Sequence, residues 1–316
     1  MTKLKGILLT EGMHGMISQV EGLAKALDIE FIHEKIVINN FWKIIPPRFT
    51  PIKKFVFKNN LKKDFNIVIS CGRKSVIPSI FLKKKYRNKI VNIHIQDPKV
   101  SLKNFDFIVV PEHDNLVGEN VLQSKGAIHY LQENELEKSK NYLKSEIKKE
   151  KLVTLIMGGP NKYYDYNDED IDKIFKKIKE NFINNGYQLV FIPSMRTPQI
   201  IIDKAKNYYN ENQIIITSID KNAYLSSLKL SDHIVVTCDS ISMISEAAIT
   251  GKPIYVAHMP NKKKNERFKK FFDLFKSLNI IRDLEDSVEY WSYKKLDETN
   301  RISRYIKDKL KNYDFS

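Results

Sequence analysis

Short runs of apolar residues recur along the chain, and segments of helix length separate several of them. Such runs lie at residues 6–10, 31–38, 66–70, 90–95, 105–110 and 127–131, and again at 152–157, 188–192, 213–216, 233–237 and 253–257. The apolar residues are continuous rather than alternating, which is typical of strands covered on both faces in a parallel sheet. Segments such as 17–27 and 76–86 have the pattern of connecting helices. The pattern therefore predicts an α/β fold.

Residues 132–150 interrupt this alternation. The segment QENELEKSKNYLKSEIKKE contains no apolar run and has the composition of a polar helical connector. A chain of 316 residues is long enough for two domains of ordinary size. We therefore predict two Rossmann-like domains, spanning residues 1–140 and 141–316.

Polar loops follow seven of the predicted strands. They read TEGMHGMISQ, CGRKS, QDPK, PEHDN, GGPNKYYD, PSMRTP and CDSIS. A single loop of this kind is typical of ordinary turn chemistry. Ligands of α/β sheets bind beyond the carboxyl ends of the strands, so seven polar loops at equivalent positions predict a binding site.

Several residues in these loops are suited to holding a phosphorylated ligand. Gly12 and Gly15 allow a tight turn before a helix whose first amides can face an anion. Arg73, Lys74 and Arg196 follow predicted strands and can pair with phosphate oxygens.

The stretch TCDSISMISEAAITGKP, residues 237–253, predicts the end of a strand, a polar turn and a short helix. Asp239 or Ser240 can cap this helix, and its amides can then face a phosphate. Glu246 lies about 9 Å further along the helix axis, where its carboxylate can accept hydrogen bonds from the two hydroxyls of a ribose. On spacing alone, a surface glutamate on an ordinary helix is the simpler interpretation.

The net charge of +15 favours an anionic partner without choosing one. Lysines concentrate at residues 53–63 and 83–89, and the first segment mixes them with aromatic and apolar residues. This mixture suits an anionic membrane surface, whereas a solvated lysine-rich face explains it equally well. No nucleic-acid partner is predicted, because neither an RNA-binding aromatic signature nor zinc-finger spacing occurs.

The sequence predicts a cytoplasmic protein. Its first residues are not typical of a signal peptide, and no run of 18 apolar residues suggests a membrane-spanning helix. The two cysteines, Cys71 and Cys238, each follow an apolar run, which fits a reducing compartment without disulfides.

Many ordered motifs resemble a known family. The segments GMHGMISQVEGLAKAL, IHIQDPK, FDFIVVPEHD, NVLQSKGAIH, SMRTP, VVTCDSISMISEAAITGKPIYV and WSYKKLDET are similar to the mitochondrial-fission family named for elongated plant mitochondria. More distantly, DSISMISEAAITGKPIYV and LIMGGPNKYY resemble the nucleotide-sugar motif and glycine loop of the N-acetylglucosaminyltransferase that forms lipid II. These resemblances imply a GT-B-like fold, in which two Rossmann-like domains with parallel sheets face across a cleft and a C-terminal helix crosses back.

The resemblance to the lipid II enzyme implies a glycosyltransferase that uses a nucleotide sugar, with a UDP-linked donor as substrate and no bound cofactor or metal. We expect it to act on an envelope or membrane-associated acceptor, at the inner face of the plasma membrane. The donor site would combine the glycine loop, the start of the helix, the strand-end arginine and the ribose-binding carboxylate. These residues are Gly12, Gly15, Gly158, Gly159, Arg196, Asp239, Ser240, Ser242 and Glu246.

Such a transferase needs a base to deprotonate the acceptor hydroxyl. Candidates at strand ends of the N-terminal domain are His14, Asp97, His113 and Asp114. His14 does not occupy the place of the histidine in the corresponding loop of the lipid II enzyme, where Ser18 stands. A short-chain epimerase is not indicated, because its nucleotide turn and Y-x-x-x-K dyad are missing.

The resemblance also implies an alternative function. Plant members of the mitochondrial-fission family are linked to the recruitment of a fission dynamin. The chain is then a non-catalytic adaptor that recruits a protein partner at a membrane. The set of polar strand ends favours the enzyme, since an adaptor has no need for a ribose site.

Overall fold

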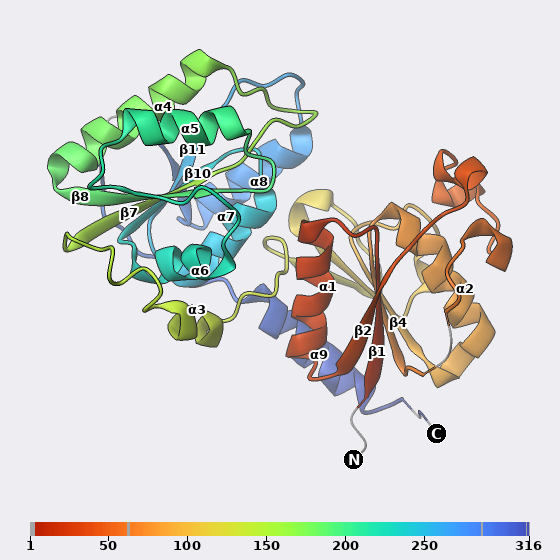
Figure 1. Cartoon of the computed structure of the whole chain (residues 1–316). Coiled ribbons are helices and arrows are strands. Elements are labelled where there is room, and N and C mark those ends of the chain that lie inside the picture. The colour runs from red at the N-terminus through yellow and green to blue at the C-terminus, as the bar shows by residue number, and fades with distance from the viewer. Residues whose placement is uncertain (1–3, 62–63, 286, 314, 316) are drawn as a thin grey trace. The chain divides into compact units, whose positions relative to one another are not determined.

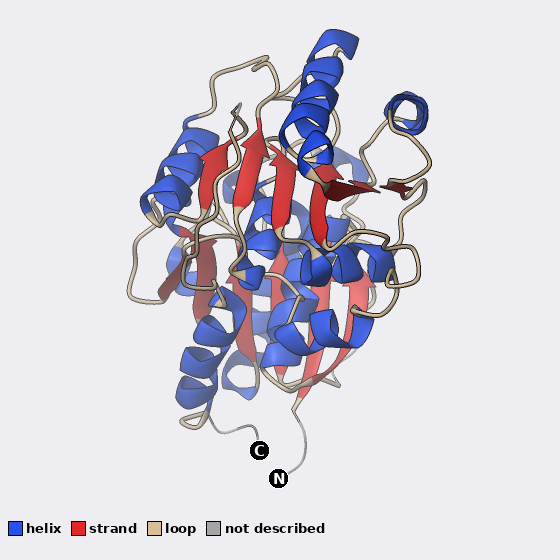
Figure 2. Cartoon of the chain, turned by 90° about the vertical axis from the view of Figure 1, so that its left-hand side faces the viewer, coloured by secondary structure: helices blue, strands red, loops and turns tan. Residues whose placement is uncertain are grey.

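A computed structural model describes residues 4–61, 64–285, 287–313 and 315. The chain forms two compact units: unit 1 is Met1–Tyr130 with Asp297–Ser316, and unit 2 is Leu131–Leu296. Each unit contains a parallel sheet of six strands with helices packed against it (Figures 1 and 2). The predicted α/β class with two parallel sheets is therefore confirmed.

The sheet of unit 1 has the strand order β2-β1-β3-β4-β5-β6. Its strands are β1 (Lys5–Thr10), β2 (Glu30–Lys35), β3 (Ile67–Cys71), β4 (Val91–Ile95), β5 (Phe107–Pro111) and β6 (Val121–Ser124). Helices α1 (His14–Ala26) and α9 (Glu298–Leu310) lie side by side on one face of the sheet, and α2 (Val76–Tyr86) lies on the other (Figure 1).

The continuous apolar runs of unit 1 supply two cores. Leu8 and Ile69 point into the cluster that contains residues of α1 and α9. Their neighbours Leu9 and Val68 point into the cluster on the α2 side. Successive residues of a strand face opposite sides of the sheet, so a strand covered on both faces needs apolar residues at every position.

The sheet of unit 2 has the order β12-β11-β10-β7-β8-β9. Its strands are β7 (Lys151–Met157), β8 (Tyr187–Pro193), β9 (Ile214–Ile215), β10 (His233–Thr237), β11 (Ile254–Ala257) and β12 (Ile281–Asp283). Its helices are α3 (Glu133–Ser139), α4 (Asp168–Asn181), α5 (Gln199–Tyr208), α6 (Lys221–Leu230), α7 (Ile241–Ala247) and α8 (Glu266–Ser277). Helices α4 and α5 lie on one face of the sheet, and α6 and α7 lie on the other (Figure 1).

Short 3₁₀ turns connect several of these elements. They are η1 (Asn40–Lys43), η2 (Pro47–Phe49), η3 (Lys54–Val56), η4 (Arg73–Ser75), η5 (Arg87–Lys89), η6 (Leu102–Asn104), η7 (Glu112–Asp114), η8 (Ile183–Asn185) and η9 (Ala248–Thr250). No described helix is both long enough and apolar enough to cross a bilayer.

One predicted strand is wrong. Residues 127–131 are not a strand, and β6 lies earlier, at Val121–Ser124. The backbone of His129 bonds instead to the Thr299 hydroxyl of α9, with its N–H donating at 3.1 Å and its carbonyl accepting at 2.9 Å. Gly22 of α1 permits this path, because a Cβ there would lie 2.3 Å from the His129 carbonyl oxygen. The run is apolar because Ile128 packs in the core.

The last helix belongs to unit 1, although the preceding 166 residues form unit 2. The Glu298 carboxylate at its start accepts a hydrogen bond from the Lys125 amide at 2.8 Å. Further along, Ile302 and Ile306 are buried in the α1 core. The sequence places the boundary between the domains at residue 140, whereas the division of the structure lies at residues 130 and 296.

Candidate functional site

Each sheet has one point at which the strand order reverses. Unit 1 has its reversal between β1 and β3, and unit 2 has its reversal between β7 and β10. If the strands of unit 2 are renumbered 1 to 6 from β7 to β12, the sheet read from β9 has the order 3-2-1-4-5-6. This is the order of dinucleotide-binding sheets. The loops at the carboxyl ends of the two central strands diverge at such a point and leave room for a ligand.

The glycine loop after β7 lies against its neighbours without space for a side chain. A Cβ on Gly158 would lie 2.0 Å from the Asp239 carboxylate, and one on Gly159 would lie 1.9 Å from the Arg196 carbonyl oxygen. The Gly158 amide donates to the Thr237 hydroxyl at 2.7 Å. Glycine is therefore required here by the close approach of three strand-end loops.

Asp239 holds these loops together. Its fully buried carboxylate pairs with the Arg196 guanidinium at 2.6 Å. It also accepts hydrogen bonds from the Thr237 hydroxyl at 2.7 Å, the Tyr166 hydroxyl and, at 3.4 Å, the Gly159 amide. Burial beside this carboxylate raises the pKa of Tyr166, which keeps its hydroxyl protonated as a donor. Asp239 is thus the centre of a structural network, and it engages Arg196, the cation for which the sequence predicts a phosphate.

Helix α7 begins directly after Asp239. Ser240 is its N-cap, and the Ser240 hydroxyl accepts from the Met243 amide at 3.4 Å. Of the two residues expected to cap this helix, Ser240 therefore has that role. Ser242 lies in the first turn and is partly exposed.

Glu246 lies near the end of α7 and is 9% exposed. Its Oε2 accepts a hydrogen bond at 2.8 Å from the hydroxyl of Tyr224, which lies on α6. A glutamate on the solvated face of a helix would be more exposed than this, so the surface interpretation does not fit. The Tyr224 hydroxyl orients a carboxylate that lies on the helix following β10.

A further loop completes this edge of unit 2. The loop after β11 pairs with the glycine loop, since the Lys262 amide donates to the Tyr163 carbonyl at 2.7 Å. At the ends of β11 and β12, His258 Nε2 lies 2.7 Å from Asp283 Oδ1. The Lys276 ammonium donates a hydrogen bond to Asp283 Oδ2. Burial raises the pKa of the Asp283 carboxyl, but the hydrogen bonds from Lys276 and His258 outweigh it, so the pKa is lowered.

The edge of unit 1 is held by a different carboxylate. Glu11, after β1, accepts from the Lys74 amide at 3.1 Å and pairs with the Lys74 ammonium at 2.8 Å. Gly12 and Gly72 have positive φ angles of 86° and 89°. His14 is the exposed first residue of α1, and Gly15 follows it.

The other three candidate bases follow β4 and β5. Asp97 accepts from the Lys99 amide at 2.8 Å and pairs with the Lys99 ammonium at 2.5 Å, as a turn residue does. The side chain of His113 has no exposed surface, and its Nε2 lies 3.8 Å from Asp114. His14 is therefore the most accessible of the four.

The structure brings one set of predicted residues together within each unit. Gly158, Gly159, Arg196 and Asp239 contact one another at the edge of unit 2, and Ser240 follows Asp239 as the N-cap of α7. In unit 1, the loop that contains Gly12 and His14 is tied to the loop that contains Lys74. No group of three His, Cys, Asp or Glu side chains among the described residues is arranged to hold a metal ion.

The chain matches the family model described as Mitochondrial fission ELM1 over residues 14–310. The chain belongs to this family. It is 29% identical over 286 residues to an uncharacterized protein of Rickettsia prowazekii, covering 78% of this chain and 80% of the relative. It is 26% identical over 274 residues to the Mitochondrial fission protein ELM1 of Arabidopsis thaliana, covering 77% of this chain and 64% of the plant protein.

Solved structures show which fold this member of the ELM1 family has. It is similar to the UDP-GlcNAc 2-epimerase from Neisseria meningitidis bound to UDP-GlcNAc, with a TM-score of 0.55 and 12% identity over 98% of this chain and 100% of that chain. The corresponding enzyme of Rickettsia bellii gives a TM-score of 0.53 and 12% identity over 99% and 96%. These likenesses show the GT-B-like fold.

Sequence reasoning missed several residues of the candidate site in this ELM1-family chain. Tyr224 precedes its partner Glu246 by 22 residues and lies on another helix, so no local motif marks it. Tyr166 lies in the segment YYDYND, in which no spacing indicates a bond to Asp239. His258 was not among the predicted site residues. Its place directly after a strand was the available signal, because ligands gather at such ends.

Proposed function

We propose that unit 2 binds a nucleoside diphosphate sugar at the carboxyl edge of its sheet, between the loops after β7 and β10. The observation that carries this proposal is Glu246, a largely buried carboxylate oriented by Tyr224 on the helix that follows β10. A carboxylate accepts hydrogen bonds only and has several acceptor positions, which suits two neighbouring ribose hydroxyls. The GT-B-like fold supports a nucleotide-sugar ligand, since the Neisseria relative in fold is bound to UDP-GlcNAc.

The chemistry that we propose is transfer of the sugar to an envelope or membrane-associated hydroxyl. The acceptor oxygen forms a bond to the anomeric carbon, and the bond from this carbon to the diphosphate breaks. The acceptor proton passes to a base, for which His14 is our choice because its imidazole is exposed at the reversal point of unit 1. Preorganised amides and cations stabilise the leaving diphosphate.

Calorimetry with UDP and UDP-GlcNAc tests the binding site. Glu246→Gln keeps the shape of the side chain but removes its charge. We expect it to cost roughly 1.5–3 kcal/mol of nucleotide affinity, or on the order of tenfold or more in Kd. Equal binding by the wild type and Glu246→Gln would show that the carboxylate does not contact the ribose.

His14→Asn tests the base separately. We expect this variant to bind nucleotide with unchanged affinity and to lose turnover of the donor, measured as release of UDP in the presence of a membrane extract. A base contributes about a hundredfold or more to the rate. Loss of nucleotide affinity instead would mean that His14 binds the donor.

The adaptor remains the second candidate. The Arabidopsis relative is named a mitochondrial fission protein, and that name describes a role in organelle division. If the wild-type chain binds no nucleotide in the calorimetry, the adaptor is the better account. Conversion of UDP-GlcNAc to its C2 epimer without an acceptor would instead indicate a 2-epimerase, which is the activity named for the structurally similar proteins.

A further inference from the structure

The connection between β2 and β3 is strongly basic. Residues 35–63 contain eight Lys and Arg residues and no Asp or Glu. Of these, Lys62 and Lys63 lie outside the described residues. We call residues 36–58, all of which the structure describes, the basic apolar segment.

Some of the apolar residues of the basic apolar segment are buried in unit 1. Ile36, Ile38, Val56 and Phe57 pack in the core on the α2 side of the sheet. A bridge pairs Ile38 with Phe57 and closes the segment at its base. Trp42 and Ile52 are partly buried against the same core, whereas Phe41, Ile44, Phe49 and Phe55 are not part of it.

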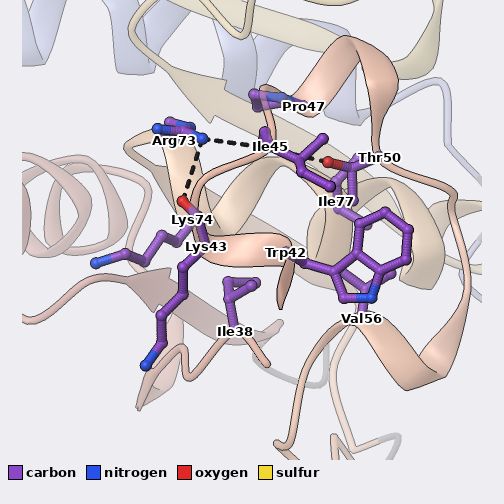
Figure 3. A pocket seen from close by; sticks show the side chains of 10 residues that line it. All are labelled: Ile38, Trp42, Lys43, Ile45, Pro47, Thr50, Val56, Arg73, Lys74 and Ile77. Atoms are coloured by element: carbon purple, nitrogen blue, oxygen red, sulfur yellow. Dashed lines mark hydrogen bonds between the residues drawn. The ribbon is translucent and has the colours of Figure 1, made fainter. Parts of the chain in front are cut away.

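The rest of the segment is held as three 3₁₀ turns. The Arg73 guanidinium donates to the carbonyls of Lys43 at 3.2 Å and Ile45 at 2.8 Å (Figure 3). The Thr50 hydroxyl donates to the Pro46 carbonyl at 3.0 Å. The turns therefore have a defined conformation, fixed by bonds to the main chain.

Four large apolar side chains point outward from these turns. The exposed fractions are 66% for Phe41, 80% for Ile44, 66% for Phe49 and 58% for Phe55. A single exposed apolar residue is ordinary, whereas four on consecutive turns mark an interaction surface. The Phe41 and Phe55 rings both contact Trp42, so at least these two belong to one cluster.

Exposed cations lie between the apolar residues. They are Lys43, Arg48, Lys53, Lys54 and Lys58. Among the described residues, no carboxylate forms an ion pair with any of them. The Arg48 guanidinium lies 4.6 Å from the centre of the Phe49 ring, and the Lys43 ammonium bonds to the neutral Asn40 side chain. An anionic partner would therefore meet cations that no carboxylate of the described residues neutralises.

We propose that the basic apolar segment docks unit 1 on an anionic lipid bilayer. Phe41, Ile44, Phe49 and Phe55 enter the boundary between headgroups and acyl chains, and the cations face the lipid phosphates. Aromatic and aliphatic side chains beside lysines are the combination that interfacial membrane binding uses. This inference goes beyond the nucleotide site, because the segment contributes no residue to the edge of unit 2.

The composition of the surface favours a bilayer over an acidic protein. Five of the six cations from residue 35 to residue 58 are lysine and one is arginine. Protein interfaces are depleted in lysine and enriched in arginine. Lysine instead suits a lipid surface, where its long stem lies along apolar groups while its ammonium stays among the headgroups.

Cosedimentation of the full chain with vesicles tests the proposal. We expect binding to phosphatidylcholine vesicles containing roughly one-third phosphatidylglycerol, and much weaker binding to phosphatidylcholine alone. Binding should weaken as salt is raised, because salt screens the cations from the lipid. Trp42 is partly exposed beside Phe41 whereas Trp291 is buried, so a blue shift of tryptophan emission on binding should come from Trp42.

Two sets of substitutions locate the surface. Replacement of Phe41, Ile44, Phe49 and Phe55 by Ser should lower the partition coefficient on the order of tenfold or more. The control replaces three exposed apolar residues elsewhere, Val117, Ile200 and Tyr290, by Ser, and should bind as the wild type does. All seven side chains are exposed, so both proteins should fold, which thermal denaturation checks.

Failure of the wild-type chain to bind the anionic vesicles at low salt would overturn the proposal and favour a protein partner for this surface. Equal binding by the fourfold variant and the control would also overturn it. Nucleotide affinity should be unchanged in the fourfold variant. The membrane surface and the nucleotide site can therefore fail independently.

Discussion

The two units have the same architecture but hold their functional edges in different ways. In unit 2 the carboxylate at the edge, Asp239, is fully buried and engages a guanidinium, two hydroxyls and an amide. In unit 1 the carboxylate at the edge, Glu11, is 15% exposed, and Lys74 is its one bonded partner among the described residues. The edge of unit 2 is fixed by packing, and the edge of unit 1 is more open.

The glycines of the two edges differ in the same way. Gly158 and Gly159 are needed for space, since a Cβ on either would meet a buried carboxylate or the main chain. Gly12 and Gly72 are needed for conformation, since their φ angles are positive while their neighbours include the flexible side chains of Lys35 and Met16. Glycine is therefore required by close packing at the edge of unit 2 and by backbone conformation at the edge of unit 1.

The largest difference should appear when the carboxylates are removed. Asp239→Ala leaves Arg196 and two hydroxyls without their acceptor, and we expect it to cost about 3–5 kcal/mol of the stability of unit 2. Glu11→Ala should cost unit 1 about 1–2 kcal/mol. Trp291 lies in unit 2 and Trp42 in unit 1, so urea denaturation of Trp42→Phe and Trp291→Phe backgrounds reports each unit separately. Equal losses of stability in Asp239→Ala and Glu11→Ala would contradict the difference between the two edges.

Substitution of the glycines separates space from conformation. Gly159→Ala forces the Arg196 main chain to move, and we expect a loss of about 2–3 kcal/mol. Gly12→Ala should cost about 1 kcal/mol, because its neighbour is the end of a lysine side chain but its φ is positive. Asn tolerates positive φ, so Gly12→Asn should recover part of the loss, whereas Gly159→Asn should recover none. Recovery at both positions, in the same denaturation assay, would contradict this distinction.

Acid should destabilise unit 1 over a wider pH range than unit 2. His94 lies on β4, between β3 and β5. Burial lowers its pKa to about 3, so protonation favours the unfolded chain as pH falls below ~6.5. Unit 1 should then lose up to about 1.4 kcal/mol per pH unit. Burial lowers the pKa of His233 in unit 2 as well, but by less, so the loss of stability from His233 ends at a higher pH than the loss from His94. The lowered pKa values of Asp220 and Asp283 add stability to unit 2 that disappears only below the ordinary aspartate range.

Urea denaturation from neutral pH down to about pH 4 measures this difference with the two tryptophan reporters. His94→Asn, which can keep a hydrogen bond to Ser70, should flatten the pH dependence of unit 1. An unchanged slope in that variant would assign the acid sensitivity to another group.

The smallest effect concerns the tyrosine that orients Glu246. Tyr224→Phe removes one hydrogen bond, and we expect nucleotide affinity to fall by about 0.5–1.5 kcal/mol. Since Tyr224 acts through Glu246, the effects of Tyr224→Phe and Glu246→Gln should not add in a double-mutant cycle. Additive losses measured by calorimetry would indicate that Tyr224 contacts the nucleotide itself.

Much of the fold could be predicted because a strand buried on both faces needs apolar residues throughout. Helix α2 was predicted with its observed bounds, and the runs of β7, β8 and β10 were found within two residues. The run at 127–131 was wrongly predicted to be a strand. Its residues are buried against helices, and apolar composition alone does not distinguish such residues from those of a buried strand. Strand β12 has three residues, too few for a periodic signal.

The candidate site could be predicted only as far as the strand ends. Their loops were found because polar residues stand out after apolar runs. The roles of Asp239 and Arg196 could not be predicted, because both residues lie in polar turns. No spacing indicates that they bind each other across 43 positions of sequence. The partnership of Tyr224 with Glu246 depends on two helices packed on one sheet face, which only the fold provides.

Hydrogen exchange of the wild-type chain with and without UDP tests the central claim, that the nucleotide binds the edge of unit 2. We expect slower exchange in residues 158–166 and 238–246 when UDP is present, because the ligand would cover amides at the ends of β7 and β10. The loops of unit 1 at residues 11–16 and 72–76 should exchange as before. Protection confined to the loops of unit 1, or an absence of protection at saturating UDP, would contradict the account.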